Sequence, residues 1–62
     1  MTLDEIAEAL RKYRIEVVAA ETGLHFNTVR RYREGQVTNP PALTKDILTA
    51  YLSARLDREG GA

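Results

Sequence analysis

The chain lacks cysteine and tryptophan, and it contains a single histidine among its 62 residues. The absence of cysteine excludes a disulfide framework, and one histidine argues against a structural zinc site, which usually takes four ligands. A domain of this length buries only about 60% of the surface that its unfolded chain exposes. Its stability must therefore come from economical helix packing or from dimerisation. We expect one domain, residues 1–58, followed by a frayed tail, residues 59–62.

Long apolar runs and an excess of charge of one sign are also missing. No stretch approaches the roughly 20 apolar residues of a membrane-spanning helix, and no signal peptide is recognisable. We therefore expect no membrane association and a cytoplasmic location. Nine basic residues balance nine acidic ones, so the net charge is zero, which is not typical of a strongly basic nucleic-acid-binding protein. The basic residues nevertheless cluster at 11–14 and 30–33, and a shared face would give a neutral molecule a positive patch.

Patterns that indicate catalysis are absent from the sequence. It contains no carboxylate pair, no nucleophile–base pair and no glycine-rich phosphate loop. The sequence therefore predicts neither an enzyme nor a protein with a cofactor or metal.

The first residues predict a helix. Thr2 and Glu5 have the spacing of a capping box, in which each side chain bonds the backbone N–H of the other residue. Apolar residues then recur at helical spacing, and we expect the helix to bury Leu3, Ile6, Ala7, Leu10 and Tyr13.

The central segment Ile15–Gly35 predicts two short helices joined by a tight turn at Gly23. Its small and apolar residues have the spacing of a helix-turn-helix: Ala19, Gly23, Leu24, Val29 and Tyr32. The segment resembles the motif of lambda-repressor-like and Cro-like regulators along its whole length. A small residue lets the two helices approach, glycine takes a positive φ without strain, and the last two apolar residues anchor the second helix. The resemblance implies a small all-α domain of four helices with a long C-terminal helix.

In that family the second helix of the motif lies in the DNA major groove. The resemblance therefore implies base contacts from polar side chains on its outer face: Asn27, Thr28, Arg30 and Arg31. It implies DNA phosphate contacts around them from Arg14, His25, Arg33, Gln36 and Thr38. Two positions depart from the family pattern, because Ile15 and Phe26 stand where related proteins usually have polar residues. Phe26 either contacts a thymine methyl or covers the seam between the helices, and we favour the seam.

The last helix is expected over residues 40–58, with Asn39 either capping it or contacting a phosphate. This helix has two apolar rows. We expect one row to face the core: Leu43, Ile47, Ala50, Tyr51 and Ala54. The other row would then be exposed and form a partner surface: Leu48, Leu52 and Leu56.

These features together predict a sequence-specific, double-stranded-DNA-binding transcriptional regulator of phage or bacterial type, associated with the nucleoid. A homodimer joined through the leucine row would bind a palindromic operator. The alternative is a helix-turn-helix module that uses the same leucine row to bind another protein as an adaptor.

Overall fold

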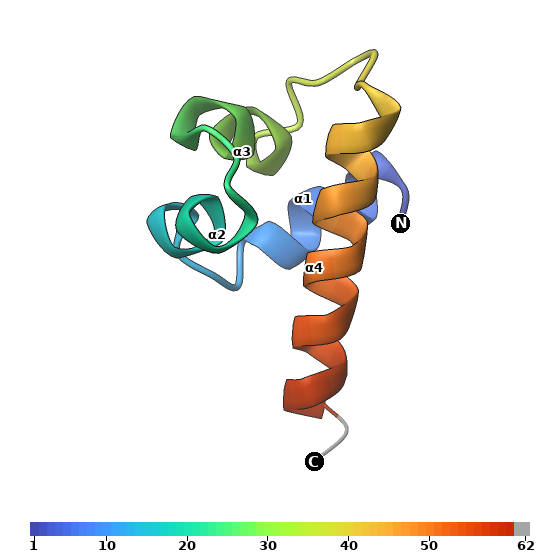
Figure 1. The fold of residues 1–62 in the computed structure, drawn as a ribbon. Coiled ribbons are helices and arrows are strands. Elements are labelled where there is room, and N and C mark those ends of the chain that lie inside the picture. The colour runs from blue at the N-terminus through green and yellow to red at the C-terminus, as the bar shows by residue number, and fades with distance from the viewer. Residues whose placement is uncertain (61–62) are drawn as a thin grey trace.

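The computed structural model describes residues 1–60, and within that range the chain forms four α-helices and no strand. They are α1 (Leu3–Leu10), α2 (Ile15–Thr22), α3 (Phe26–Arg33) and α4 (Ala42–Gly60). The three short helices pack together on one side of α4, whose C-terminal end projects beyond them (Figure 1). The predicted all-α fold with a long final helix is confirmed.

The capping box at the start of α1 is present. Thr2 Oγ1 accepts the backbone N–H of Glu5 at 3.2 Å, and Glu5 Oε1 accepts the backbone N–H of Thr2 at 2.7 Å. The hydrogen bond from the Thr2 backbone favours the ionised carboxylate, and it lowers the pKa of Glu5. Of the predicted core positions in this region, Ile6 and Leu10 are buried, whereas the others are only half-buried. Ala9, which we did not predict, is buried as well.

Each of the two helices of the motif ends at or next to a glycine with positive φ. Gly23, at φ 77°, ends α2 and donates its N–H to the carbonyl of Ala19 at 2.9 Å. Gly35, at φ 73°, follows α3, and the next N–H, that of Gln36, returns to the carbonyl of Arg31 at 3.0 Å. This second arrangement is a Schellman motif, which satisfies carbonyls that the helix itself leaves free. The turn between α2 and α3 therefore has the predicted form.

Gly23→Ala is expected to lower the free energy of unfolding by about 1–2 kcal/mol, because an L-residue is strained in the left-handed region. The cost is conformational, since a Cβ added at Gly23 meets nothing within 4 Å. Gly60→Ala is the matched control, because that site is helical and also open within 4 Å. Urea unfolding followed by circular dichroism measures both, and equal stabilities of the two variants would contradict the role assigned to Gly23.

The core shows that our assignment of the two rows on α4 was wrong. Leu48 and Leu52 are both 0% exposed, and Leu56 is half-buried against the same core. In the row that we expected to be buried, Leu43 is 72% exposed, and both alanines are exposed as well. Burial of Leu48 and Leu52 removes two complete leucine side chains from water, which stabilises this orientation of the helix. Leu48 and Leu52 therefore cannot form the dimer or adaptor surface that we assigned to them.

The ends of α4 also differ from the prediction. The helix begins at Ala42, and the carbonyl of Pro41 accepts the N–H of Lys45 at 3.1 Å. Pro40 cannot open the helix as we predicted, because a residue that precedes proline is disfavoured in helical conformation. Asn39 consequently lies outside the helix and does not cap it. At the other end, residues 59 and 60 are helical rather than frayed, while 61 and 62 lie outside the described residues.

A polar cluster around Arg55 fastens the C-terminal half of α4 to the rest of the domain. The guanidinium lies 4.2 Å from the ring centre of Tyr13, in the α1–α2 turn, and donates to Glu59 Oε2 at 3.2 Å and to the Tyr51 hydroxyl at 2.7 Å. Tyr51 in turn donates to Glu21 of α2. Burial and this carboxylate raise the pKa of Tyr51. The cluster thus joins α4 to α2 and to the turn that precedes it.

Candidate nucleic-acid interface

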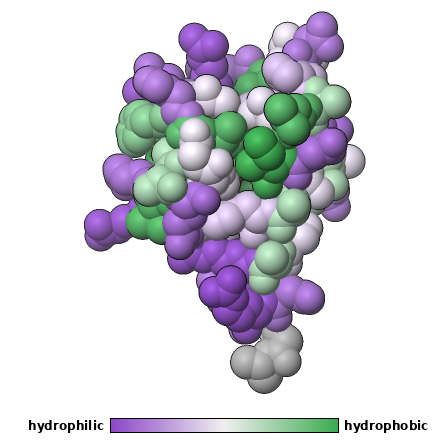
Figure 2. Space-filling view, viewed as in Figure 1, coloured by the Kyte–Doolittle hydropathy of each residue, from purple (hydrophilic) through white to green (hydrophobic). Residues whose placement is uncertain are grey.

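Helix α3 is held by one face and exposes the other. Val29 is 0% exposed and Tyr32 is 3% exposed, so both side chains anchor the helix in the core. The opposite face follows from a helical period of 3.6 residues, and it carries Asn27, Arg30 and Arg31, all exposed. Hydrophilic side chains line the upper left edge of the molecule, where α3 lies (Figure 2). Three of the four residues predicted to contact bases therefore share one solvent-facing surface, and the fourth, Thr28, is half-buried at its edge.

His25 has a structural role that we did not predict. Its Nδ1 accepts the backbone N–H of Asn27 at 3.1 Å, so His25 is the N-cap of α3. The bond leaves Nε2 of the same ring as the nitrogen that can reach a phosphate. The sequence did not indicate this cap, because Ser, Thr, Asp and Asn are the usual residues at that position.

Arg30 makes an ion pair within α3. Its Nε lies 3.8 Å from Glu34 Oε2, and the two side chains are 56% and 44% exposed. Exposed pairs of this kind contribute about 0–1 kcal/mol, so the pair does not prevent Arg30 from turning to another partner.

Two of the predicted phosphate-contacting residues lie together at the start of α2. Arg14 and Arg33 line one shallow pocket of about 300 Å³, together with Tyr13, Ile15 and Glu16. Arg14 is the N-cap residue of α2, and its side chain makes no capping hydrogen bond. The first N–H groups of α2 are therefore open to an acceptor at this pocket. Arg14 and Arg33, which are far apart in the sequence, thus form one basic pocket on one side of α3.

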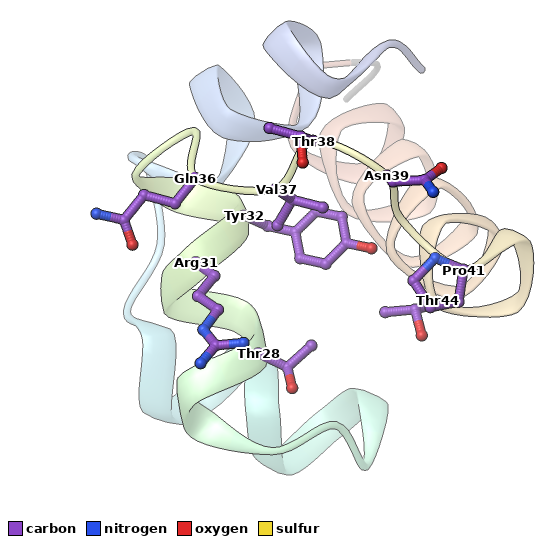
Figure 3. Close-up of a pocket in the computed structure, with 9 residues that line it drawn as sticks. All are labelled: Thr28, Arg31, Tyr32, Gln36, Val37, Thr38, Asn39, Pro41 and Thr44. Atoms are coloured by element: carbon purple, nitrogen blue, oxygen red, sulfur yellow. The ribbon is translucent and has the colours of Figure 1, made fainter.

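The other side of α3 borders a groove of about 410 Å³ that extends to the beginning of α4 (Figure 3). The lining residues come from α3, the following loop and the first turn of α4: Thr28, Arg31, Tyr32, Gln36, Val37, Thr38, Asn39, Pro41 and Thr44. Gln36 and Thr38, which we predicted to contact phosphates, both belong to this groove. No acidic side chain lines it.

Tyr32 contributes a group to this groove that the sequence interpretation overlooked. Its hydroxyl is shielded from solvent and has no hydrogen-bond partner among the described residues. Burial of the ring raises the pKa of Tyr32. We had considered this residue only as an apolar anchor, because its position in the motif requires no more than a hydrophobic side chain.

Other classes of site are not apparent in the described part of the chain. Residues 1–60 contain no group of three or more histidine or acidic side chains arranged to hold a metal ion. None of the described helices has the length and apolar content needed to cross a bilayer. No family model, curated protein or solved structure matches the chain.

Proposed function

We propose that the protein is a sequence-specific DNA-binding regulator of the lambda-repressor-like or Cro-like kind, with α3 as the helix that enters the major groove. The observation that carries the proposal is the exposed set Asn27, Arg30 and Arg31 on a helix whose opposite face is fixed by Val29 and Tyr32. Asparagine pairs bidentately with adenine N6 and N7, and arginine with guanine O6 and N7. An anchored helix holds these groups in one register, which is what base reading requires.

The surroundings of α3 support the same proposal. A helix in the major groove has a phosphate backbone on either side. Arg33 and Thr28 are five residues apart, so they lie about 140° apart around the helix axis. Arg33 belongs to the basic pocket at the start of α2, and Thr28 belongs to the groove at the start of α4. Groups suited to phosphates thus flank both sides of the base-reading face.

We further propose that two copies associate through the outward row of α4, which consists of Leu43, Ile47, Ala50 and Ala54. Its spacing of four, three and four residues matches the apolar seam of paired helices. Hydrophobic side chains gather over the visible face of α4 (Figure 2), and Leu43 is 72% exposed. A two-fold pair would present two copies of α3 to half-sites about 34 Å apart on a palindromic operator.

Selection from random duplexes tests the DNA-binding proposal. The selected duplex is expected to bind at least about 10³-fold more tightly than random duplex at physiological salt, with an affinity that falls as salt rises. Equal affinity for selected and random duplexes would contradict sequence-specific binding. Absence of duplex binding even at low salt would instead favour a protein-interaction module.

Leu43→Lys is expected to prevent association of the two copies, because the substitution places a charge in the proposed seam at its most exposed large apolar side chain. The variant should elute as a monomer in size-exclusion chromatography with light scattering, and its unfolding midpoint as a monomer should be unchanged, because Leu43 is 72% exposed. Lys45→Leu, on the adjoining half-buried surface of the same helix, is the control and should leave the oligomeric state unchanged. A Leu43→Lys protein that remains dimeric would exclude this surface.

A further inference from the structure

Among residues 1–60, the Tyr32 hydroxyl is the buried side-chain group that has no hydrogen-bond partner. The side chain is 3% exposed, and the hydroxyl has no partner among residues 1–60. Leaving such a group unpaired costs free energy, and a phenylalanine would fill the same space without that cost. Figure 3 shows the hydroxyl pointing across the groove toward the segment that contains Asn39, Pro41 and Thr44. The hydroxyl oxygen therefore lies on the groove side of the ring.

The remaining groups of the groove are suited to an anion. Arg31 is its charged residue, and Thr28, Thr38 and Thr44 add hydroxyls that can donate. No carboxylate lines the groove to compete for these donors. The arginine offers a fork of N–H groups that matches the oxygens of a phosphate.

The first turn of α4 adds backbone donors. This helix is 19 residues long, and Pro41, which precedes it, has no side-chain acceptor that could cap it. Pro41 accepts from Lys45, which leaves the N–H groups of Ala42, Leu43 and Thr44 without partners within the helix. These groups carry the positive end of the helix dipole. Threonine hydroxyls, a guanidinium and Thr44 of the first turn of α4 thus line the groove into which the unpaired Tyr32 hydroxyl points.

We propose that the groove between α3 and the start of α4 binds a phosphoryl group, with the Tyr32 hydroxyl, the Arg31 guanidinium and the first turn of α4 as its donors. This inference rests on the proposed function and deepens it. The phosphoryl group is either a backbone phosphate of the duplex that α3 reads or a free phosphate compound, since the chemistry of both is the same. Arg31 then contacts the phosphate instead of a base, which revises its assignment above, and Asn27 and Arg30 remain as the base-reading residues of α3.

Tyr32→Phe separates this role from a purely structural one. Because the substitution removes the unpaired hydroxyl and keeps the ring, the melting temperature is expected to rise by about 4–8 °C. Duplex affinity is expected to fall by about 10–100-fold, since a hydrogen bond to a charged acceptor is lost. The loss should be equal for selected and random duplexes. A role in packing alone would leave duplex affinity unchanged.

Two further variants complete the comparison. Tyr51→Phe is the matched control, because its hydroxyl donates to Glu21 outside both the groove and the basic pocket, and its duplex affinity should equal that of the unsubstituted protein. Arg31→Ala is expected to weaken all duplexes equally and to reduce the salt dependence by about one phosphate contact. If Arg31→Ala changes the preference between sequences instead, Arg31 reads a base and its assignment to the groove is wrong.

Titration with inorganic phosphate and pyrophosphate identifies the source of the phosphoryl group. Shifts of the Thr44 amide resonance that are present in the unsubstituted protein and reduced in Tyr32→Phe would show binding of free phosphate, whether or not any duplex binds. A Tyr32→Phe effect confined to duplex binding would assign the groove to the DNA backbone. The proposal is overturned if Tyr32→Phe equals the unsubstituted protein in both assays. Failure of the DNA-binding proposal is recognised separately, by equal affinity for selected and random duplexes or by no duplex binding at all.

Discussion

Leu48→Ala is expected to lower the free energy of unfolding by about 2–5 kcal/mol, which is the usual cost of truncating a fully buried leucine. Leu48 is 0% exposed and packs in the cluster that joins α4 to the three shorter helices. A domain with about 0.05–0.15 kcal/mol of stability per residue has little in reserve, so a large part of the variant population should be unfolded at 37 °C. Urea unfolding followed by circular dichroism at 222 nm measures the change.

Leu43→Ala is the matched control, because it makes the same substitution on the same helix at a side chain that is 72% exposed. Its cost is expected to stay within about 0.5 kcal/mol when the protein is monomeric. The reverse order of the two effects would mean that α4 is rotated about its axis, with the Leu43 row inside. Measurement at low protein concentration separates this packing effect from any loss of association.

Asn27→Ala is expected to reduce the ratio of affinities for selected and random duplexes by about 10–100-fold, because one bidentate contact discriminates between bases by roughly 1–3 kcal/mol. The stability of the domain should change little. Asn27 is exposed, and its backbone N–H, rather than its side chain, makes the capping bond with His25. Competition binding with selected and random duplexes, performed at one salt concentration, measures the ratio.

Two other substitutions show what the Asn27 result means. Ser53→Ala alters an exposed residue of α4 and should leave both affinities unchanged. Arg33→Ala, in the basic pocket beside α2, should weaken both duplexes by the same factor, as expected for a phosphate contact. If Asn27→Ala also weakened both duplexes equally, Asn27 would contact the backbone and the reading face of α3 would have to be reassigned.

The features that could be predicted from the sequence are those fixed by neighbours along the chain. The capping box at Thr2 depends on residues three apart, and Gly23 and Gly35 stand where the backbone requires a positive φ. Once Val29 is known to face the core, the helical period alone turns Asn27 and Arg31 outward. Local hydrogen bonds and backbone conformation determine all of these.

The arrangement of α4 could not be predicted in this way. Its two rows both recur at helical spacing, so periodicity does not decide which row is buried. The choice depends on how α4 fits against the other three helices, and in the structure Leu48 and Leu52 are the fully buried residues of this helix. The start of the helix, by contrast, could have been predicted from the local sequence. Pro41 disfavours a helical conformation at Pro40, which already argues against a helix that begins there.

Within the candidate site, the sequence indicated the exposed polar residues of α3 but neither the His25 cap nor the role of the Tyr32 hydroxyl. A histidine cap depends on the rotamer that brings Nδ1 to the N–H of Asn27. The groove beside Tyr32 exists only because the loop after Gly35 carries Thr44 and the start of α4 back toward α3. That path is a property of the tertiary structure, and no local pattern contains it.

The Arg55 cluster implies that α4 does not open as a single unit. Its middle is held by Leu48 and Leu52, whereas its last turns are held by a guanidinium stacked on Tyr13 and by the hydrogen bond that the Tyr13 hydroxyl donates to Glu59. Polar contacts at a partly exposed surface exchange readily with water, so the backbone amides after Arg55 should exchange with deuterium by local fraying. The amides near Leu48 should exchange only when the whole domain unfolds. The boundary between slowly and rapidly exchanging amides therefore lies within one continuous helix.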